Sequence, residues 1–235
     1  MAAAKVQLCG RFVVELDDRR VEAALPGRQG RLLLAYLVLH RARPVARDEL
    51  VEALWRDGRN GGLAPLLSKL RRVVPFDGLR PDLPGLRVDV EDAAAAVHRA
   101  ESALALGRAA AAWAPAQIAM EISARPFLAG EEGAWVDAER RRLADVHVRA
   151  LEAYAAATLG IGGTELAAAV RAGRSLVELE PYRESGHRLL MEALDRQGNT
   201  AEALIVYETL RRRLSGDLGV TPSAQTLELH RRLLR

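Results

Sequence analysis

Cysteine, lysine and long apolar runs are scarce in this 235-residue chain, and each scarcity excludes a class of protein. Cys9 is the only cysteine, which excludes an intrachain disulfide and a thiolate metal cluster. No stretch approaches the roughly 18 consecutive apolar residues of a membrane span. The opening Met-Ala-Ala-Ala-Lys also lacks the apolar core of a signal peptide. We therefore expect a cytoplasmic protein with no membrane partner.

Residue patterns for catalysis or cofactor binding are also missing. The five histidines are widely separated, and none stands in a His-x-x-x-His or His-Glu-x-x-His spacing. Lysine occurs only at Lys5 and Lys69, and there is no Gly-x-x-x-x-Gly-Lys-Ser/Thr phosphate loop. Residues 160–164 are rich in glycine, but no strand precedes them, so a turn between helices explains them better. We predict no enzymatic activity, no catalytic residues, no metal site and no cofactor.

Positive charge is concentrated in the first part of the sequence. Residues 1–90 contain 16 Lys and Arg against 11 Asp and Glu, whereas residues 91–235 contain 18 against 20. The net charge of the chain, +3, is therefore the sum of a basic part and a slightly acidic part. A local basic excess of this kind attracts a phosphate backbone.

The first 55 residues change from a strand pattern to a helix pattern. Apolar alternation over residues 6–16 predicts one strand, and a second short strand is centred on Val21. From residue 28 to about 41 the apolar residues follow a helical period, which Pro44 ends. A second helix is predicted over about 47–55, where acidic residues in the first turn favour a helix start.

A third predicted helix, over residues 63–74, has a divided surface. Its apolar residues form one stripe at helical spacing: Leu63, Leu67, Leu70 and Val74. The opposite face is small, polar and basic, and carries Ala64, Pro65, Ser68, Lys69 and Arg72, with Arg71 beside it. Small residues allow close approach to a DNA major groove, and basic side chains reach phosphates or guanine edges. A solvated face without a partner is the more ordinary interpretation of the same pattern.

The segment after Pro75 is typical of strands joined by tight turns. Asp77-Gly78 and Pro84-Gly85 are turn pairs, and the apolar residues between them predict a hairpin that ends near Val90. Strands, three helices and a terminal hairpin are the layout of a winged helix. We therefore expect an α+β winged helix-turn-helix domain in residues 1–91, with the third helix facing outward and the hairpin as its wing.

The sequence from residue 92 onward is helical almost throughout. Breaks are predicted near Gly107, Pro115, 126–133, 160–163, Pro181, Gly198 and 216–222. Short helices between such breaks predict an all-α domain of TPR-like helical hairpins in residues 92–235, so the fold as a whole is mainly α. Trp113 and Trp135 are expected to be packing aromatics of this second domain, and buried Cys9 to be an inert thiol of the first.

Several stretches resemble a known family. Leu-Pro-Gly-Arg-Gln-Gly-Arg-Leu-Leu-Leu-Ala-Tyr-Leu from Leu25 and Val-Ala-Arg-Asp-Glu-Leu-Val-Glu-Ala-Leu-Trp from Val45 resemble the OmpR-type winged helix of the Streptomyces antibiotic regulatory protein (SARP) family. Residues 68–72 match the end of its recognition helix, and residues 84–88 resemble its wing. The motifs from Ala201 and from Leu210 are similar to the bacterial transcriptional activator domain of that family.

The resemblance implies a transcriptional activator that binds direct repeats in double-stranded DNA and recruits RNA polymerase. The residues expected to bind DNA are Ala64, Ser68, Lys69, Arg71, Arg72, Arg80 and Arg87, and the loop expected to contact polymerase contains Arg59 and Asn60. We expect a monomer or weak homodimer in solution and two protomers on DNA. Ala46 departs from the family, which tends to have a helix-capping hydroxyl residue there. The alternative hypothesis is a protein-interaction adaptor whose winged helix no longer binds DNA.

Overall fold

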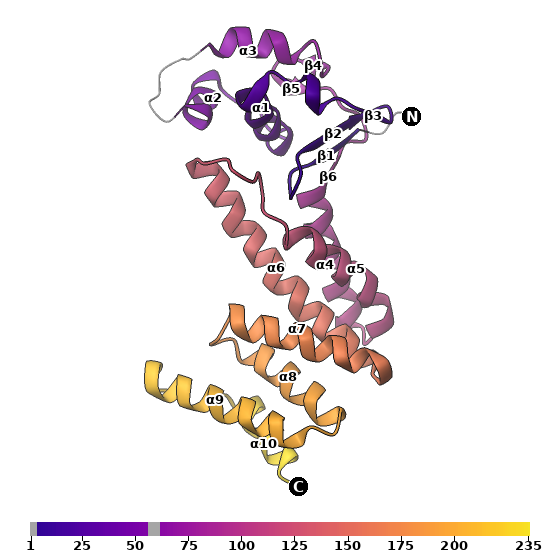
Figure 1. Ribbon diagram of the computed structural model, residues 1–235, viewed down its shortest axis with the longest axis vertical. Coiled ribbons are helices and arrows are strands. Elements are labelled where there is room, and N and C mark those ends of the chain that lie inside the picture. Colours follow the sequence, from indigo (N-terminus) through magenta and orange to yellow (C-terminus); the bar gives the residue numbers. More distant parts are fainter. Residues whose placement is uncertain (1–3, 56–61) are drawn as a thin grey trace. The chain divides into compact units, whose positions relative to one another are not determined.

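A computed structural model describes residues 4–55 and 62–235 and divides into two compact units (Figure 1). The first unit contains the described part of Met1–Asp92 together with Arg125–Leu143. The second contains Ala93–Ala124 and Ala144–Arg235. The return of residues 125–143 to the first unit differs from the division at residue 91 that the sequence suggests. Its cause is backbone pairing between segments far apart in the chain.

A four-stranded sheet forms one part of the first unit. Its strands are β1 (Lys5–Gln7), β2 (Val13–Leu16), β3 (Arg19–Arg20) and β6 (Arg87–Val88), in the order β3-β2-β1-β6. β1 is antiparallel to β2 and parallel to β6, with Val6 opposite both Val14 and Val88. The single strand predicted over residues 6–16 is wrong, because the chain turns back at Gly10, whose φ of 78° is accessible to glycine without strain.

Three helices follow the strands: α1 (Gly27–Leu39), α2 (Arg47–Leu54) and α3 (Leu63–Leu70). All three helices predicted from periodicity are present, but the third ends at Leu70 instead of Val74, and residues 71–73 form a turn. The second predicted strand is only β3, because a 3₁₀ turn, η1 (Glu22–Ala24), occupies the residues after Val21. α1 is the core helix of this unit, since residues 32–38 are all buried. α2 begins after Ala46 without a side-chain cap, as its methyl side chain requires.

The predicted hairpin is shorter and lies earlier than expected. β4 (Phe76–Asp77) pairs with β5 (Arg80–Pro81), and Gly78 has a φ of 60° at the turn between them. Residues 84–88, which resemble the family's wing, do not form a hairpin of their own. Gly85 lies in a turn closed by a hydrogen bond from Leu86 N to Leu83 O (3.2 Å), and the chain then enters β6 beside β1. The hairpin therefore lies at residues 76–81 and not at residues 84–88.

Residues 125–143 complete the first unit by pairing with the turn after β1. Gly10 N donates to Pro126 O and Leu128 N donates to Leu8 O, both at 2.9 Å. The Trp135 indole N–H donates to Ala53 O at 3.0 Å. Trp135 is thus a packing aromatic of the first unit rather than of the second domain, because its helix begins among first-unit residues.

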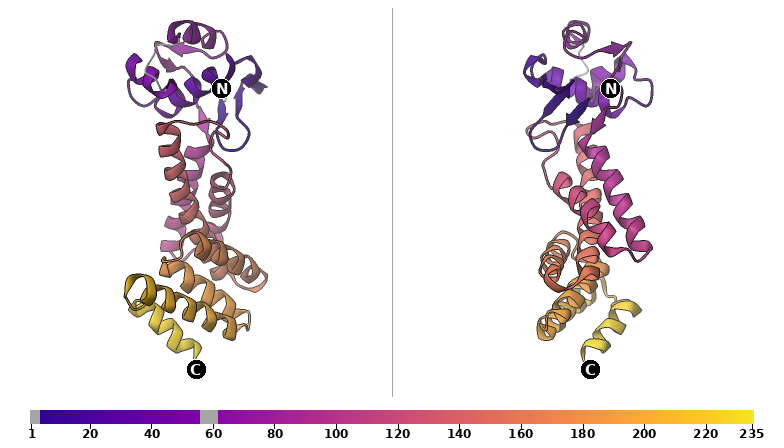
Figure 2. Two further views of the ribbon diagram at one scale, coloured as in Figure 1. Left: turned by 60° about the vertical axis from the view of Figure 1, so that its left-hand side comes forward. Right: turned by 90° about the vertical axis from the view of Figure 1, so that its right-hand side faces the viewer.

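The second unit is built of helices (Figure 2). They are α4 (Asp89–Ala105), α5 (Ala109–Ser123), α6 (Ala134–Ile161), α7 (Leu166–Leu179), α8 (Glu184–Arg196), α9 (Thr200–Leu218) and α10 (Ala224–Leu233), with the 3₁₀ turn η2 (Gly163–Glu165) before α7. The residues of α4 up to Asp92 and of α6 up to Leu143 belong to the first unit. Successive helices fold back on one another, which confirms the predicted helical hairpins. The break predicted at Pro115 is wrong, because Pro115 lies inside α5.

Two kinds of core hold these helices together. α4, α5 and α6 pack mainly through alanine, which brings their axes close, and Ala100, Ala112 and Ala157 are fully buried there. α7 to α10 pack around larger side chains such as Met191, Leu194 and Tyr207. These cores fix the faces that α4, α6, α8 and α10 present to solvent.

Candidate nucleic-acid interface

The surface of α3 is divided as its sequence predicts. The four residues of the apolar stripe are buried, with exposed fractions of 3% or less for Leu63, Leu67, Leu70 and Val74. The residues predicted to face outward are all exposed: Ala64, Pro65, Ser68, Lys69, Arg71 and Arg72. Burial of one stripe therefore leaves the small, polar and basic face of α3 open to solvent.

Two of the basic side chains, Lys69 and Arg72, have no hydrogen-bond or ion-pair partner among the described residues. The same holds for the Ser68 side chain. Their donors are available for another molecule. Flexible, solvated cations of this kind cost little to redirect toward a phosphate, because no existing contact has to be broken.

Arg71 differs from Lys69 and Arg72 in having a hydrogen-bond partner. It follows the last residue of α3, and its Nη2 donates to Gly78 O in the β4–β5 turn at 2.7 Å. This bond ties the tip of the hairpin to the end of the helix. Arg71 is therefore a positioning residue for the hairpin as well as a cation on the exposed face.

The two remaining predicted arginines lie on different elements. Arg80 is exposed on β5, in the hairpin that Arg71 holds. Arg87 is on β6 in the four-stranded sheet, where its Nη2 lies 2.9 Å from Oδ2 of Asp92. The structure thus brings Arg80 into the same substructure as α3 but places Arg87 in another sheet with its charge paired. Arg59 and Asn60 fall outside the described residues.

A polar cluster that the sequence analysis missed positions α2 against α1. Glu49 of α2 accepts hydrogen bonds from the Tyr36 hydroxyl and from Arg43, whose Nη1 lies 3.0 Å from Oε2. These donors, Arg43 first, hold the pKa of Glu49 at about 2. Desolvation and the Glu49 carboxylate raise the pKa of Tyr36 to about 12. Spacing alone gave no signal for the cluster, because its members come from two helices and the turn between them.

Asp89 joins the sheet to the start of α4. Its carboxylate accepts hydrogen bonds from Leu8 N at 2.9 Å and Cys9 N at 2.8 Å, which fixes the turn after β1. Burial raises the pKa of Asp89, although these backbone donors act in the opposite direction. The Cys9 thiol is fully buried, and its pKa is raised mainly by desolvation, so it is held in the protonated, unreactive form.

Residues 4–55 and 62–235 contain neither a metal-binding cluster nor a membrane-spanning helix. No group of three or more His, Cys, Asp or Glu side chains there is arranged to hold a metal ion. In the same residues, no helix combines the length and apolar character that crossing a bilayer requires.

Comparison with known sequences identifies one matching family and several related regulatory proteins. The family described as "Bacterial transcriptional activator domain" matches residues 88–234. The regulatory protein AfsR of Streptomyces coelicolor is 34% identical over 219 residues, which cover 88% of this chain and 22% of AfsR. The transcriptional regulatory protein EmbR of Mycobacterium tuberculosis is 28% identical over 252 residues, which cover 97% of this chain and 62% of EmbR. The chain thus spans less than two thirds of the length of these relatives.

Comparison with solved structures finds the same architecture. The structure of Mycobacterium tuberculosis EmbR in complex with a low affinity phosphopeptide matches with a TM-score of 0.80 and 25% sequence identity. The match covers 100% of this chain and 66% of that chain. The winged helix and helical hairpins described above are therefore shared with EmbR along the whole of the chain.

Proposed function

The chain belongs to the SARP family of transcriptional regulators with a bacterial transcriptional activator domain, and we propose that it binds specific duplex DNA through α3. The family membership makes it a transcription regulator. The manner of DNA binding, the contact with polymerase and the arrangement on DNA are the content of the proposal. We also propose a cytoplasmic location, because a transcription regulator acts where DNA and RNA polymerase are. A further part of the proposal is that the chain has no catalytic activity.

The observation that carries the proposal is the uncommitted outer face of α3. Lys69 projects from it beside the short side chains of Ala64 and Ser68, and Arg72 lies in the turn just after α3; neither cation has a partner among the described residues. Short side chains on the outer face permit the helix backbone to approach base edges, and the two cations would supply phosphate contacts. Arg71 and Arg80 would extend the contact to the β4–β5 hairpin. Arg87 is a weaker candidate, because binding a phosphate would require it to leave Asp92.

The division of labour between domains is part of the same proposal. We assign DNA binding to the N-terminal domain, which contains residues 1–91. We assign transcriptional activation to the helical domain in residues 92–235. Arg59 and Asn60, in the loop before α3, are proposed to contact RNA polymerase on the basis of the family resemblance. The excess positive charge of residues 1–90 supports placing DNA on this part of the chain.

The test begins with selection of duplexes from a random pool by the full chain. Lys69→Ala and Arg72→Ala are then compared with the parent protein in a salt series on a selected duplex. Each variant should bind more weakly, and the slope of log affinity against log salt should fall by about one for each lost phosphate contact. Arg19→Ala is the matched control, because Arg19 is an exposed arginine on β3, far along the chain from α3.

Two results would refute the proposal. If the double variant of Lys69 and Arg72 binds the selected duplex as tightly as the parent, then α3 is not the docking element. If no duplex is enriched even at low salt, the alternative function is favoured, in which the chain is an adaptor that binds proteins through its helical unit.

A further inference from the structure

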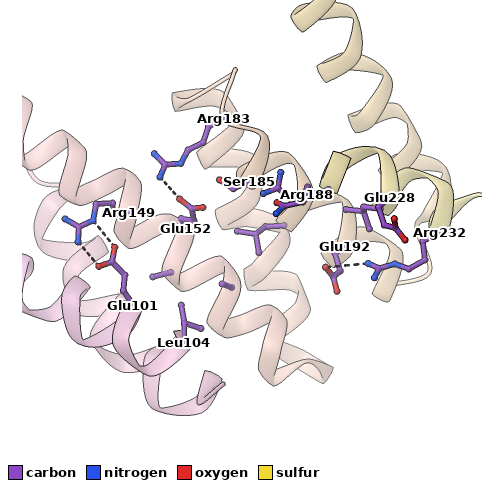
Figure 3. A pocket seen from close by; sticks show the side chains of 15 residues that line it. Glu101, Leu104, Arg149, Glu152, Arg183, Ser185, Arg188, Glu192, Glu228 and Arg232 are labelled. Carbon is purple, nitrogen blue, oxygen red and sulfur yellow. Dashed lines mark hydrogen bonds and ion pairs between the residues drawn. The ribbon is translucent and has the colours of Figure 1, made fainter. Parts of the chain in front are cut away.

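A groove on the second unit is lined by the same pattern of side chains on every second helix, namely α6, α8 and α10 (Figure 3). It has a volume of about 660 Å³ and is lined by α4, α6, α8 and α10 with the residue just before α8. α6, α8 and α10 each contribute residues at positions i, i+3, i+4 and i+7, which share one helix face. The i+3 residue is charged in each case and the i+4 residue is apolar. The charged residues are Glu152, Arg188 and Glu228, and the apolar residues are Ala153, Leu189 and Leu229.

The charges of Glu152, Arg188 and Glu228 alternate in sign from α6 to α8 to α10. Of these three side chains, only Glu152 forms an ion pair with another described residue. Glu152 is paired with Arg183 at 2.8 Å. Arg188 donates one hydrogen bond, from Nη1 to Thr226 Oγ1 at 3.2 Å, and forms no ion pair with the described residues. Glu228 is exposed and has neither a hydrogen bond nor an ion pair with them. The groove therefore presents on neighbouring helices a cation, Arg188, whose charge is balanced within the unit only by the electrostatic attraction of Glu184, and an anion, Glu228.

The position of Arg188 is set by the contacts that hold α10 on α8. Glu184 accepts hydrogen bonds from Ser223 and from Thr226, and Thr226 in turn accepts the bond from Arg188. One of the five N–H groups of the guanidinium is used in this way, so most of its donors remain available to a carboxylate. In Figure 3 Arg188 lies between the Arg183–Glu152 pair and the Glu192–Arg232 pair.

We propose that this groove binds an extended peptide segment of a partner protein, with an acidic side chain at Arg188 and a basic side chain at Glu228. The apolar residues Leu189 and Leu229 form the floor between the two charges. Packed helix axes lie ~8–10 Å apart, and an extended peptide in the polyproline II conformation advances about 3.1 Å per residue and returns to the same face every three residues. The acidic and basic residues of the ligand should therefore be about three positions apart, with an apolar side chain between them. Charge complementarity of this kind selects the direction and register of the peptide.

The proposal is tested with fluorescent octapeptides that are acetylated and amidated at their ends. Each contains one glutamate and one lysine separated by one, three or five positions, in both orders, with leucine, alanine and serine elsewhere. The full chain should bind one order at a separation of three at least tenfold more tightly than the other peptides. Arg188→Gln and Glu228→Gln should each weaken that peptide about tenfold. Arg171→Gln, an exposed arginine of α7 outside the groove, should have no effect.

The charge-swapped double variant Arg188→Glu with Glu228→Arg gives the sharpest outcome, because the preferred order of glutamate and lysine should invert. The Glu228 variants guard against misfolding, since Glu228 has no partner to lose among the residues that the structure describes. Equal binding of all spacings, or a preference that the swap leaves unchanged, would overturn the proposal. It would also be overturned if sedimentation showed a dimer that Arg188→Gln dissociates, because the occupant would then be a second copy of the chain.

Discussion

Gly173 of α7 and Leu190 of α8 are so close that a Cβ atom added at Gly173 would lie 3.1 Å from the Cβ of Leu190 and 3.2 Å from its Cα. The contact is matched by Gly186 of α8, where an added Cβ would lie 2.9 Å from Cγ of Leu176. The two helices thus pack by placing a glycine of each against a leucine of the other. The backbone of α8, which carries Arg188 and Leu189 into the groove, is positioned by this contact.

Replacing Gly173 by alanine should destabilise the protein by about 1–3 kcal/mol, because the new methyl group overpacks a contact that includes backbone atoms. The measurement is the free energy of unfolding in urea. Gly216→Ala is the matched control, since Gly216 lies in α9 with nothing within 4 Å of an added Cβ. That variant should gain up to about 1 kcal/mol from helix propensity. Equal effects of the two substitutions would contradict the packing described for α7 and α8.

The Glu49 cluster predicts a loss of stability in acid. The pKa of Glu49 is about 2 in the folded protein, below its ordinary value of 4.5. A depressed folded pKa means that the carboxylate contributes stability above pH 4.5, which is lost as the pH falls toward 2. Glu49→Gln should lower the urea midpoint at pH 7, and its difference from the parent should narrow between pH 4.5 and pH 2.

The control for this experiment is Glu52→Gln. Glu52 is on the same helix but is exposed and makes no side-chain interaction with the described residues. Its substitution should change the midpoint little at any pH. A difference between Glu49→Gln and the parent that grows in acid would show that the carboxylate does not stabilise the α1–α2 arrangement.

The contact between Arg71 and Gly78 predicts that two adjacent arginines have different effects. Arg71→Ala should speed hydrogen exchange of the backbone amides of Asp77 and Arg80, because the hairpin loses its tie to α3. Arg72→Ala should leave these amides unchanged. If the hairpin contributes to DNA binding as proposed, Arg71→Ala should weaken binding at least as much as Arg72→Ala. Faster exchange in both variants would mean that the Gly78 contact is not what orders the hairpin.

On DNA we expect two protomers side by side on a direct repeat. One such module buries only about 600–1,000 Å² and reads few base pairs, which gives a poor specificity ratio in a genome. Inserting half a helical turn between the repeats should abolish cooperative binding while each half-site still binds one protomer. Sedimentation with a two-repeat duplex measures the stoichiometry. Binding that is one-to-one, or indifferent to the insertion, would exclude the tandem arrangement.

Periodicity in the sequence predicted the helices well, because each amphipathic stripe is a local property. The stripe from Leu63 to Val74 is buried as predicted, and so is the core face of α1. Pro115 was misread as a helix end, because alanine-rich sequence on both sides favours a helix strongly enough to include it. The shift of the hairpin to residues 76–81 was missed, since two turn pairs compete in that segment and only packing decides between them.

The features that the sequence did not reveal depend on residues far apart in the chain. The hydrogen bonds between residues 8–10 and 126–128 use backbone atoms, which leave no mark in side-chain pattern. The row of charges at Glu152, Arg188 and Glu228 is regular only after the helices that carry them are stacked. The burial and exposure of residues 63–74 could be predicted, whereas the end of α3 at Leu70 and the tie from Arg71 to the hairpin could not.

The pairing of residues 125–143 with the first unit has a consequence for protein synthesis. A ribosome releases the chain from its N-terminus, so the segment 93–124 emerges before the first unit has received all of its residues. Until residues 125–143 have left the exit tunnel, Gly10 N and Leu8 O in the turn after β1 lack their backbone partners, and Ala53 O lacks the Trp135 indole. The first unit therefore cannot finish folding before residue 143 has emerged, and an N-terminal fragment that stops at residue 92 lacks part of its own core.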